Sequence, residues 1–237
     1  MMLNHLGILA MTVGGALAFA AVQPVQAQSP SSQDLLKTCL SCHGPGGIST
    51  LPSRPSIAGQ RGNYVARQLT SFLQAAEVHA ANRAQDTDDD AVGTGDPRGS
   101  SLRVDPIMEH MVTGLDATQI VKVSAAIAAL PCRLDETVIK LPPPTPPSIS
   151  KSCAVCHGVD GVGDQHDVPI LAGQQRAYLR RQLLLLRETA WGAPPREGDI
   201  SRAHPIMESE SARLRIKDVD ILAKYYSALD CRGRAAK

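Results

Sequence analysis

The sequences CLSCH at Cys39–His43 and CAVCH at Cys153–His157 stand 114 positions apart, and the rest of the chain is organised around them. The segment after each motif is repeated as well. RPSIAGQRGNYVARQL at 54–69 matches VPILAGQQRAYLRRQL at 168–183, again with an offset of 114. A constant offset over two blocks indicates two copies of one structural unit.

Two further blocks repeat with a shorter offset. DPIMEHM at 105–111 matches HPIMESE at 204–210, and ALPCR at 129–133 matches ALDCR at 228–232, both with an offset of 99. The first copy therefore carries about fifteen extra residues between its matched blocks. They fall in the polar, Gly-rich segment 79–105, which predicts a surface loop.

The composition divides the chain into four parts. An uncharged apolar run at 6–22 is followed by the small-residue site Val25-Gln26-Ala27, so we predict a signal peptide at 1–27, with a membrane anchor as the alternative. The sequence KLPPPTPPS predicts a semi-rigid linker at 140–148. The two copies of the unit are then expected at 28–139 and 149–237.

Each copy is expected to be helical, because no part of the chain shows sustained strand alternation. Helix starts are predicted at Ser31 or Ser32 with Asp34 in the first turn, near Asn63, and at Asp116 with Gln119 as capping-box partner. The predicted core positions are Val65, Leu69, Phe72, Leu73, Ile120, Val123, Ile127 and Leu130 in the first copy, and Leu179, Leu183, Leu186, Val219, Leu222, Tyr226 and Leu229 in the second.

Cys-x-x-Cys-His is the attachment motif of a c-type haem, in which two thiols bind the porphyrin and the His binds the iron. Two such motifs predict two covalent haems, at Cys39, Cys42 and His43 and at Cys153, Cys156 and His157. A structural zinc site or a thioredoxin-like pair explains neither the two His residues nor the repeat. Aromatic residues make up 3% of the chain, and two haems would supply the missing apolar core.

The repeat also selects candidates for the sixth iron ligand. Met108 and Met207 occupy equivalent positions in the PIM blocks, whereas Met111 is matched by Glu210. A Met ligand gives a low-spin electron carrier of raised potential. The rival ligands lack a matching His in the other copy or lie in polar segments; they are His79, His110, His166 and His204.

With both motifs, both AGQ blocks and both PIM blocks, the sequence resembles the dihaem cytochrome c4 family over nearly all of the predicted mature chain. The resemblance implies an all-α fold of two tandem class I cytochrome c domains, each wrapped around one haem and related by a pseudo-twofold. It also implies periplasmic electron transfer. In such domains a Pro twelve residues after the His accepts a hydrogen bond from the imidazole, a role that falls to Pro55 and Pro169.

Two pairs of equivalent residues lie outside these motifs. Cys132 and Cys231 end the last helix of each copy, and in an oxidising compartment they would pair if their Cα atoms lie within about 7 Å. Free thiols or bonds to another chain are the alternatives. Arg67 and Arg181 are candidates for binding haem propionates, with an exposed helix charge as the alternative.

The net charge of +1 argues against a nucleic-acid partner. Residues 28–141 hold 10 basic and 12 acidic side chains, a net charge of −2, and residues 142–237 hold 14 and 11, a net charge of +3. Such a dipole would orient a redox partner, although ordinary scatter gives the same pattern. Contact with a membrane surface is also compatible with the chain.

Three functions follow from these observations. The first is a periplasmic carrier of single electrons between a donor and a respiratory oxidase or reductase, with no substrate chemistry of its own. The second is the cytochrome subunit of a sulfide or thiosulfate dehydrogenase complex. The third, a dihaem peroxidase-like enzyme, needs an open or labile iron position, against which the paired Met residues argue.

Overall fold

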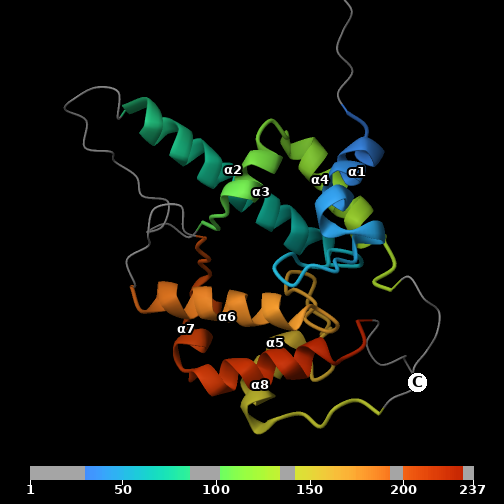
Figure 1. The fold of residues 1–237 in the computed structure, drawn as a ribbon, viewed down its shortest axis with the longest axis vertical. Coiled ribbons are helices and arrows are strands. Elements are labelled where there is room, and N and C mark those ends of the chain that lie inside the picture. The colour runs from blue at the N-terminus through green and yellow to red at the C-terminus, as the bar shows by residue number, and fades with distance from the viewer. Residues whose placement is uncertain (1–29, 86–101, 134–141, 193–199, 232–237) are drawn as a thin grey trace, which may run out of the picture.

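A computed structural model describes residues 30–85, 102–133, 142–192 and 200–231, and in these ranges the regular elements are helices (Figure 1). The elements are α1 (Ser32–His43), η1 (Pro45–Gly47), α2 (Gly62–Gln85), α3 (Pro106–Val112), α4 (Ala117–Ala128), η3 (Ser148–Ser150), α5 (Lys151–His157), α6 (Arg176–Ala190), α7 (Pro205–Ala212) and α8 (Ile216–Ser227).

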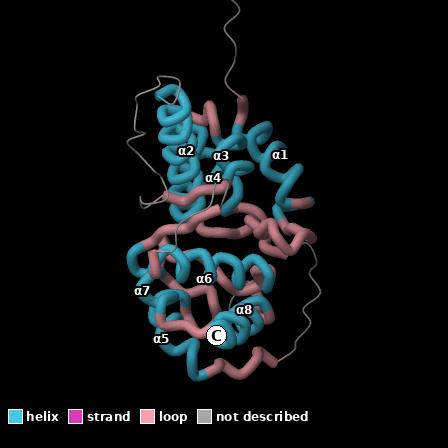
Figure 2. Tube along the Cα trace, turned by 60° about the vertical axis from the view of Figure 1, so that its left-hand side comes forward, coloured by secondary structure: helices cyan, strands magenta, loops and turns pink. Residues whose placement is uncertain are grey.

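The helices form two groups, stacked one above the other in Figure 1. In the first group α2 packs against α3 and α4, and α1 packs against α4; in the second, α6 packs against α7 and α8. Figure 2 shows that irregular segments, rather than helices, lie between the two groups. The predicted all-α arrangement of tandem units is thus present, whereas the exact domain boundaries remain predictions.

Each group has a separate apolar core. The first contains Val65, Leu69, Phe72, Val112, Ile120, Val123 and Ile127. The second contains Ala172, Leu179, Leu214, Val219, Leu222, Ala223, Tyr225, Tyr226 and Leu229. The predicted core positions are buried except Leu73, Leu130 and Leu183, which are partly exposed. The helical spacing of apolar residues therefore identified both cores, because each helix turns one apolar face inward.

The helix starts agree with the sequence signals. Ser31 caps α1 by accepting a hydrogen bond from the Asp34 N–H. Asp116 and Gln119 form the predicted capping box of α4, in which each side chain accepts a hydrogen bond from the backbone N–H of the other residue. These caps satisfy N–H groups that have no partner inside the helix.

The prediction of a surface loop at 79–105 is wrong at both ends. Helix α2 continues to Gln85, because Ala, Arg and Gln favour the helix there. At the other end Val104 pairs with Ser201 in an antiparallel bridge with two backbone hydrogen bonds of 3.1 Å. The segment between these ends, 86–101, lies outside the described residues.

The predicted signal peptide at 1–27 also lies outside the described residues. Among the residues that are described, none of the helices combines the length and the hydropathy needed to span a bilayer. The predicted linker is described at 142–147, where the chain is non-helical, as its prolines require.

Candidate haem-binding sites

Helices α1 and α5 present the two Cys-x-x-Cys-His motifs in the same way. Each motif forms the last turn of its helix, and a Gly with positive φ follows the His: Gly44 at 87° and Gly158 at 72°. All four motif cysteines are half-buried free thiols. Burial raises the pKa of the Cys39 and Cys153 thiols, which keeps these thiols protonated.

The imidazole of each motif is held by a carbonyl oxygen twelve residues later in the sequence. His43 Nδ1 lies 2.8 Å from Pro55 O, and His157 Nδ1 lies 3.0 Å from Pro169 O. A carbonyl only accepts, so Nδ1 carries the proton and Nε2 keeps its lone pair. Burial, as the largest effect, lowers the pKa of both His residues and so favours the neutral ring that can bind a metal.

The two candidate sixth ligands lie at equivalent places in the first turn of short helices. Met108 lies in α3, is half-buried and packs against the first core. Met207 lies in α7, is also half-buried, and belongs to a helix that packs against α6. The helices start at different caps: the Asp105 carboxylate accepts from Met108 N, whereas a ring nitrogen of His204 accepts from Met207 N.

The rival His ligands have other surroundings. His110, His166 and His204 are exposed. His79, which we expected in a polar segment, lies on α2 with its Nδ1 2.7 Å from the carboxylate of the buried Glu109. Within the described ranges, His, Cys, Asp and Glu side chains form no cluster of three or more that could hold a metal ion.

The donor set fits two covalent haems. Each motif offers two unpaired thiols and a neutral imidazole on one helical turn, whereas the other two cysteines of the chain are bonded to each other. A structural zinc site would gather its thiolates around one ion, and a stable disulfide would consume them. Thiols that are half-buried, reduced and adjacent to a neutral His match thioether attachment.

Two arginines that sequence reasoning missed connect the halves. Arg103 donates to Gln68 and Tyr178, each at 2.7 Å, and Arg202 donates to Gln182 and to Tyr64 at 2.8 Å. Each guanidinium thus binds one glutamine of its own half and one tyrosine of the other half. The signal was in the sequence, because both copies read Arg-x-x-Pro-Ile-Met and the repeat extends three residues before the Pro.

These arginines also lie close enough to the motif His residues to lower their pKa through charge, Arg103 at His43 and Arg202 at His157. Among the described residues, neither arginine forms an ion pair with a carboxylate; their polar partners are neutral oxygens. The predicted arginines differ from them. Arg67 is exposed and donates to the backbone carbonyl of Asp167 across the interface, and Arg181 is exposed.

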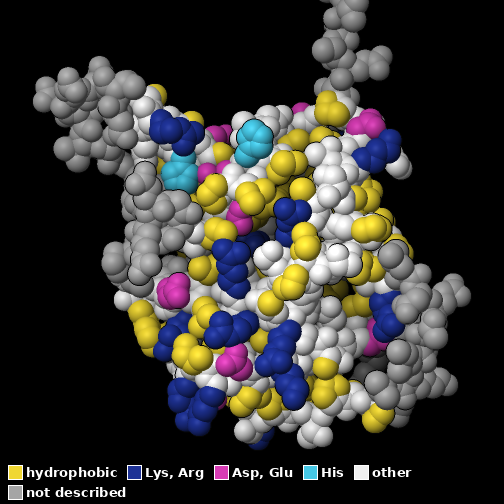
Figure 3. Space-filling view, in the orientation of Figure 1, with side chains coloured by type: hydrophobic (Ala, Val, Ile, Leu, Met, Phe, Trp, Pro, Cys, Tyr) yellow, Lys and Arg dark blue, Asp and Glu magenta, His cyan; other side chains and the backbone are white. Residues whose placement is uncertain are grey.

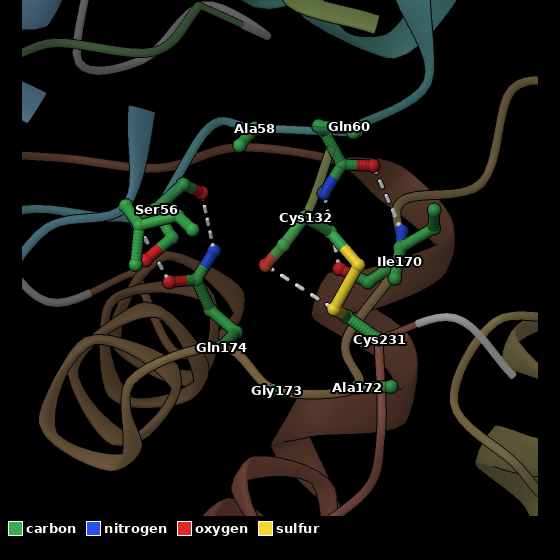
Figure 4. A pocket seen from close by; sticks show the side chains of 11 residues that line it. Ser56, Ala58, Gln60, Cys132, Ile170, Ala172, Gly173, Gln174 and Cys231 are labelled. Atoms are coloured by element: carbon green, nitrogen blue, oxygen red, sulfur yellow. Dashed lines mark hydrogen bonds between the residues drawn. A yellow bond between two sulfur atoms is a disulfide. The ribbon is translucent and has the colours of Figure 1, made fainter. Parts of the chain in front are cut away.

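The predicted disulfide between Cys132 and Cys231 is present, with the Cα atoms 6.2 Å apart. It lies at a small cavity between the halves, of about 60 Å³ (Figure 4). Gly59 and Gly173 of the AGQ blocks face it with φ of 68° and 71°. A Cβ at Gly59 would lie 3.0 Å from Cys132 Cβ, and one at Gly173 would lie 3.2 Å from Cys231 Cβ. Close approach and positive φ therefore explain both glycines.

Charge is distributed unevenly over the molecule. In the face shown in Figure 3, Lys and Arg side chains gather over the lower, C-terminal half. This agrees with the net charge of +3 for residues 142–237, which hold 14 basic and 11 acidic side chains.

Comparisons with known proteins agree with this architecture. The family model for cytochrome c matches residues 148–229. A cytochrome c4 of Azotobacter vinelandii is 29% identical over 93% of this chain and 96% of its own. A thiosulfate dehydrogenase electron acceptor of Thiomonas intermedia is 25% identical over 91% of this chain and 87% of its own. The crystal structure of cytochrome c4 from Pseudomonas stutzeri superposes with a TM-score of 0.57 at 23% identity, covering 85% of this chain and all of that one.

The all-α halves and the two attachment motifs define an electron-transfer protein of the c-type cytochromes, with two covalently bound haems. Within that class the chain is similar to cytochrome c4 proteins over most of its length, at 29% identity to those of Azotobacter vinelandii and Stutzerimonas stutzeri.

Proposed function

We propose that Cys39 and Cys42 bind one haem and Cys153 and Cys156 the other, with His43 and Met108 as axial ligands in the first half and His157 and Met207 in the second. The observation that carries this proposal is the pair of equivalent His–Pro contacts, 2.8 Å in one half and 3.0 Å in the other. When bound, each haem supplies an iron that takes up and releases one electron.

The protein residues around each iron would fix its environment. The carbonyls of Pro55 and Pro169 hold the rings in one orientation and keep Nδ1 protonated, which increases the basicity of Nε2. A thioether sulfur at the sixth position favours the reduced state and raises the potential. With a His and a Met bound to each iron, no position on the iron would remain for a substrate, so the proposed role is electron transfer without bond chemistry.

Arg103 and Arg202 are better candidates than Arg67 and Arg181 for binding the haem propionates. They influence the motif His residues electrostatically, lie at the interface, and have no carboxylate partner among the described residues. A guanidinium in a half-buried position is stabilised by a carboxylate. A propionate would provide that partner in each half.

We propose a periplasmic location and a role between a donor and a membrane oxidase or reductase. The Cys132–Cys231 disulfide supports an oxidising compartment, as does the apolar segment at 6–22. The basic C-terminal half favours an acidic partner surface, because opposite charges accelerate encounter between redox proteins.

The second candidate is electron acceptor of a thiosulfate-oxidising dehydrogenase. It is supported by the 25% identity to the Thiomonas intermedia electron acceptor over 91% of the chain. The discriminating assay follows reduction of the ferric protein by thiosulfate in the presence of a purified thiosulfate dehydrogenase. Rapid reduction that depends on the dehydrogenase would favour this role, and reduction only by respiratory donors would favour the first.

The ligand proposal is tested by a potentiometric titration of the purified holoprotein, followed by visible and near-infrared spectra. We expect two one-electron steps and low-spin spectra with the Met-to-iron band in both halves. A high-spin haem that binds carbon monoxide when reduced would overturn the Met assignment in that half and favour the peroxidase-like alternative.

A further inference from the structure

The irregular segments between the halves carry two equivalent side-chain amides. Gln60 and Gln174 follow the glycines of the AGQ blocks, and each is only 8% exposed. Gln174 accepts from Ser56 N at 3.0 Å and donates to Ser56 O at 2.8 Å. Gln60 accepts from Ile170 N at 2.9 Å and donates to Ile170 O at 3.0 Å. Figure 4 shows both pairs on either side of the disulfide.

Each glutamine therefore binds the backbone of the other half at two points. Ser56 and Ile170 are equivalent residues, 114 positions apart, as are Gln60 and Gln174. Only a primary amide offers a donor and an acceptor side by side for such pairing with one residue. The glutamine oxygens also accept from the next backbone N–H, Arg61 N at 3.0 Å and Gln175 N at 3.1 Å, which fixes their orientation.

The bound residues directly follow the prolines that hold the iron-binding His. The carbonyl of Pro55 and the N–H of Ser56 belong to one peptide group, as do the carbonyl of Pro169 and the N–H of Ile170. His43 donates to the oxygen of the first group, while Gln174 accepts from its nitrogen. His157 and Gln60 bind the second group in the same way. One trans peptide thus carries the imidazole on one side and the glutamine on the other.

From this geometry we propose that Gln174 tunes the haem of the N-terminal half and Gln60 tunes the haem of the C-terminal half, each through the peptide group that it binds across the interface. They are positioning residues that act on the iron through Pro55 or Pro169 and the imidazole. The inference rests on the proposed haem ligation by His43 and His157.

Hydrogen bonds in a chain polarise one another, so an acceptor at Ser56 N–H makes the Pro55 oxygen a better acceptor for His43. The stronger bond at Nδ1 makes the imidazole more basic and stabilises the oxidised iron. Gln174 therefore lowers the potential of the N-terminal haem, and Gln60 lowers that of the C-terminal haem. Contacts across the interface therefore influence the potentials of both haems.

The test uses the full holoprotein with Gln174→Met, which keeps the side-chain length and removes both hydrogen bonds. We expect the potential of the N-terminal haem to rise and that of the C-terminal haem to stay unchanged. The largest expected change in the reduction equilibrium is about tenfold, which is about 59 mV for one electron. Gln60→Met should raise the potential of the C-terminal haem and leave that of the N-terminal haem unchanged. Each step is assigned to its half from the Met-to-iron band lost in a single Met variant.

Gln175 offers a matched control. Its side chain also donates across the interface, but to Ser49 O, a carbonyl that holds no motif His. Gln175→Met should leave both potentials in place. Two substitutions by glutamate should shift the potential in the opposite direction. Gln174→Glu keeps an acceptor for Ser56 N–H and should lower the N-terminal potential. The decrease should be larger than in Gln175→Glu, which adds the same charge but is not hydrogen-bonded to the peptide that binds His43.

A second measurement does not involve electron transfer. In the reduced, diamagnetic protein the ¹⁵N chemical shift of His43 Nδ1 should move in Gln174→Met and not in Gln175→Met. The proposed tuning through the peptide group is overturned if Gln174→Met changes the potential of neither haem or changes both equally. It is also overturned if Gln174→Met and Gln60→Met change the potential of the same haem. If the wild-type protein shows no pair of one-electron steps, the proposed function itself fails. If it shows both steps and the glutamine variants leave the potentials unchanged, only the proposed tuning by Gln60 and Gln174 fails.

Discussion

The two halves share a framework but surround their irons with different charges. Asp105 caps the Met helix of the first half with a carboxylate, and His204 caps that of the second with an imidazole. The Asp105 charge raises the pKa of His43 as a minor effect beside burial. Burial lowers the pKa of His204, so this ring is neutral near pH 7 and can accept the hydrogen bond from Met207 N. The proposed ligands are therefore the same in both halves, while the side chains beside them differ. We expect two unequal potentials, with the N-terminal haem the lower because Asp105 is a carboxylate.

The largest expected effect comes from the proposed ligands. Met108→His should lower the potential of the N-terminal haem, because an imidazole favours the oxidised iron more than a thioether does. Axial ligands span about 0.8 V, and we expect a shift of about 0.1–0.3 V. Potentiometry with near-infrared spectra would show one Met-to-iron band lost and one kept. Met207→His should do the same in the other half, and an unchanged spectrum in either variant would refute that ligand.

The disulfide tests whether the halves behave as one unit. It joins residues 99 positions apart, and removal of such a bond costs about 2–5 kcal/mol. The double variant Cys132→Ser with Cys231→Ser should melt at lower temperature in calorimetry, with separate transitions for the two halves. Wild-type protein heated with a reductant is the control and should lose the same stability. A melting profile identical to that of the oxidised wild type would contradict this expectation.

The cap charges account for a smaller part of the difference. Asp105→Asn removes the carboxylate and keeps a good helix cap. We expect the N-terminal potential to rise by about 20–60 mV, where about 59 mV is a tenfold change in equilibrium for one electron. The converse variant His204→Asp should lower the C-terminal potential. Both variants can be measured by spectroelectrochemical titration. If the difference between the two haem potentials stays the same as in the wild type, the cap residues do not contribute to it.

The smallest effect concerns the start of the last helix in each half. α4 begins with the Asp116–Gln119 capping box, whereas at the start of α8 the Asp218 carboxylate accepts from Arg215 N and from its guanidinium. The side-chain hydrogen bonds from Arg215 hold the pKa of Asp218 below its ordinary value. The carboxylate thus contributes stability above its unfolded pKa of about 3.9, and this is lost as pH falls through the lower folded value.

Asp218→Asn should accordingly melt below the wild type at pH 5 to 7, and the gap should narrow as the pH approaches 2. Melting temperatures followed by circular dichroism over this range provide the measurement. A gap that is independent of pH would mean that the charge of Asp218 contributes nothing to the start of α8.

The sequence was most informative where a residue acts within its own half. The cap Ser31, the capping box at Asp116 and the apolar faces of α2, α4, α6 and α8 follow from local spacing, because helix periodicity fixes them. The His–Pro contacts were expected from the family resemblance and are present. The disulfide was one of three alternatives, and only the 6.2 Å between the Cα atoms decides among them.

Residues that act between the halves were harder to predict. Gln60 and Gln174 were visible as repeated letters, but their partners lie about 110 positions or more away in the other half. Arg103 was assigned to a surface loop because its segment is polar, and only the meeting of the two halves brings the half-buried Tyr178 of α6 to its guanidinium. Local pattern cannot predict contacts that depend on how two folded units meet.

The disulfide also changes the topology of the molecule. Together with the backbone between Cys132 and Cys231, it closes a covalent ring that contains the proline segment at 142–147 and the second half. One protease cut in that exposed segment opens the ring and leaves the two halves joined. Only a cut followed by reduction can release them, so the chain tolerates a nick at the place where a two-unit protein is usually divided.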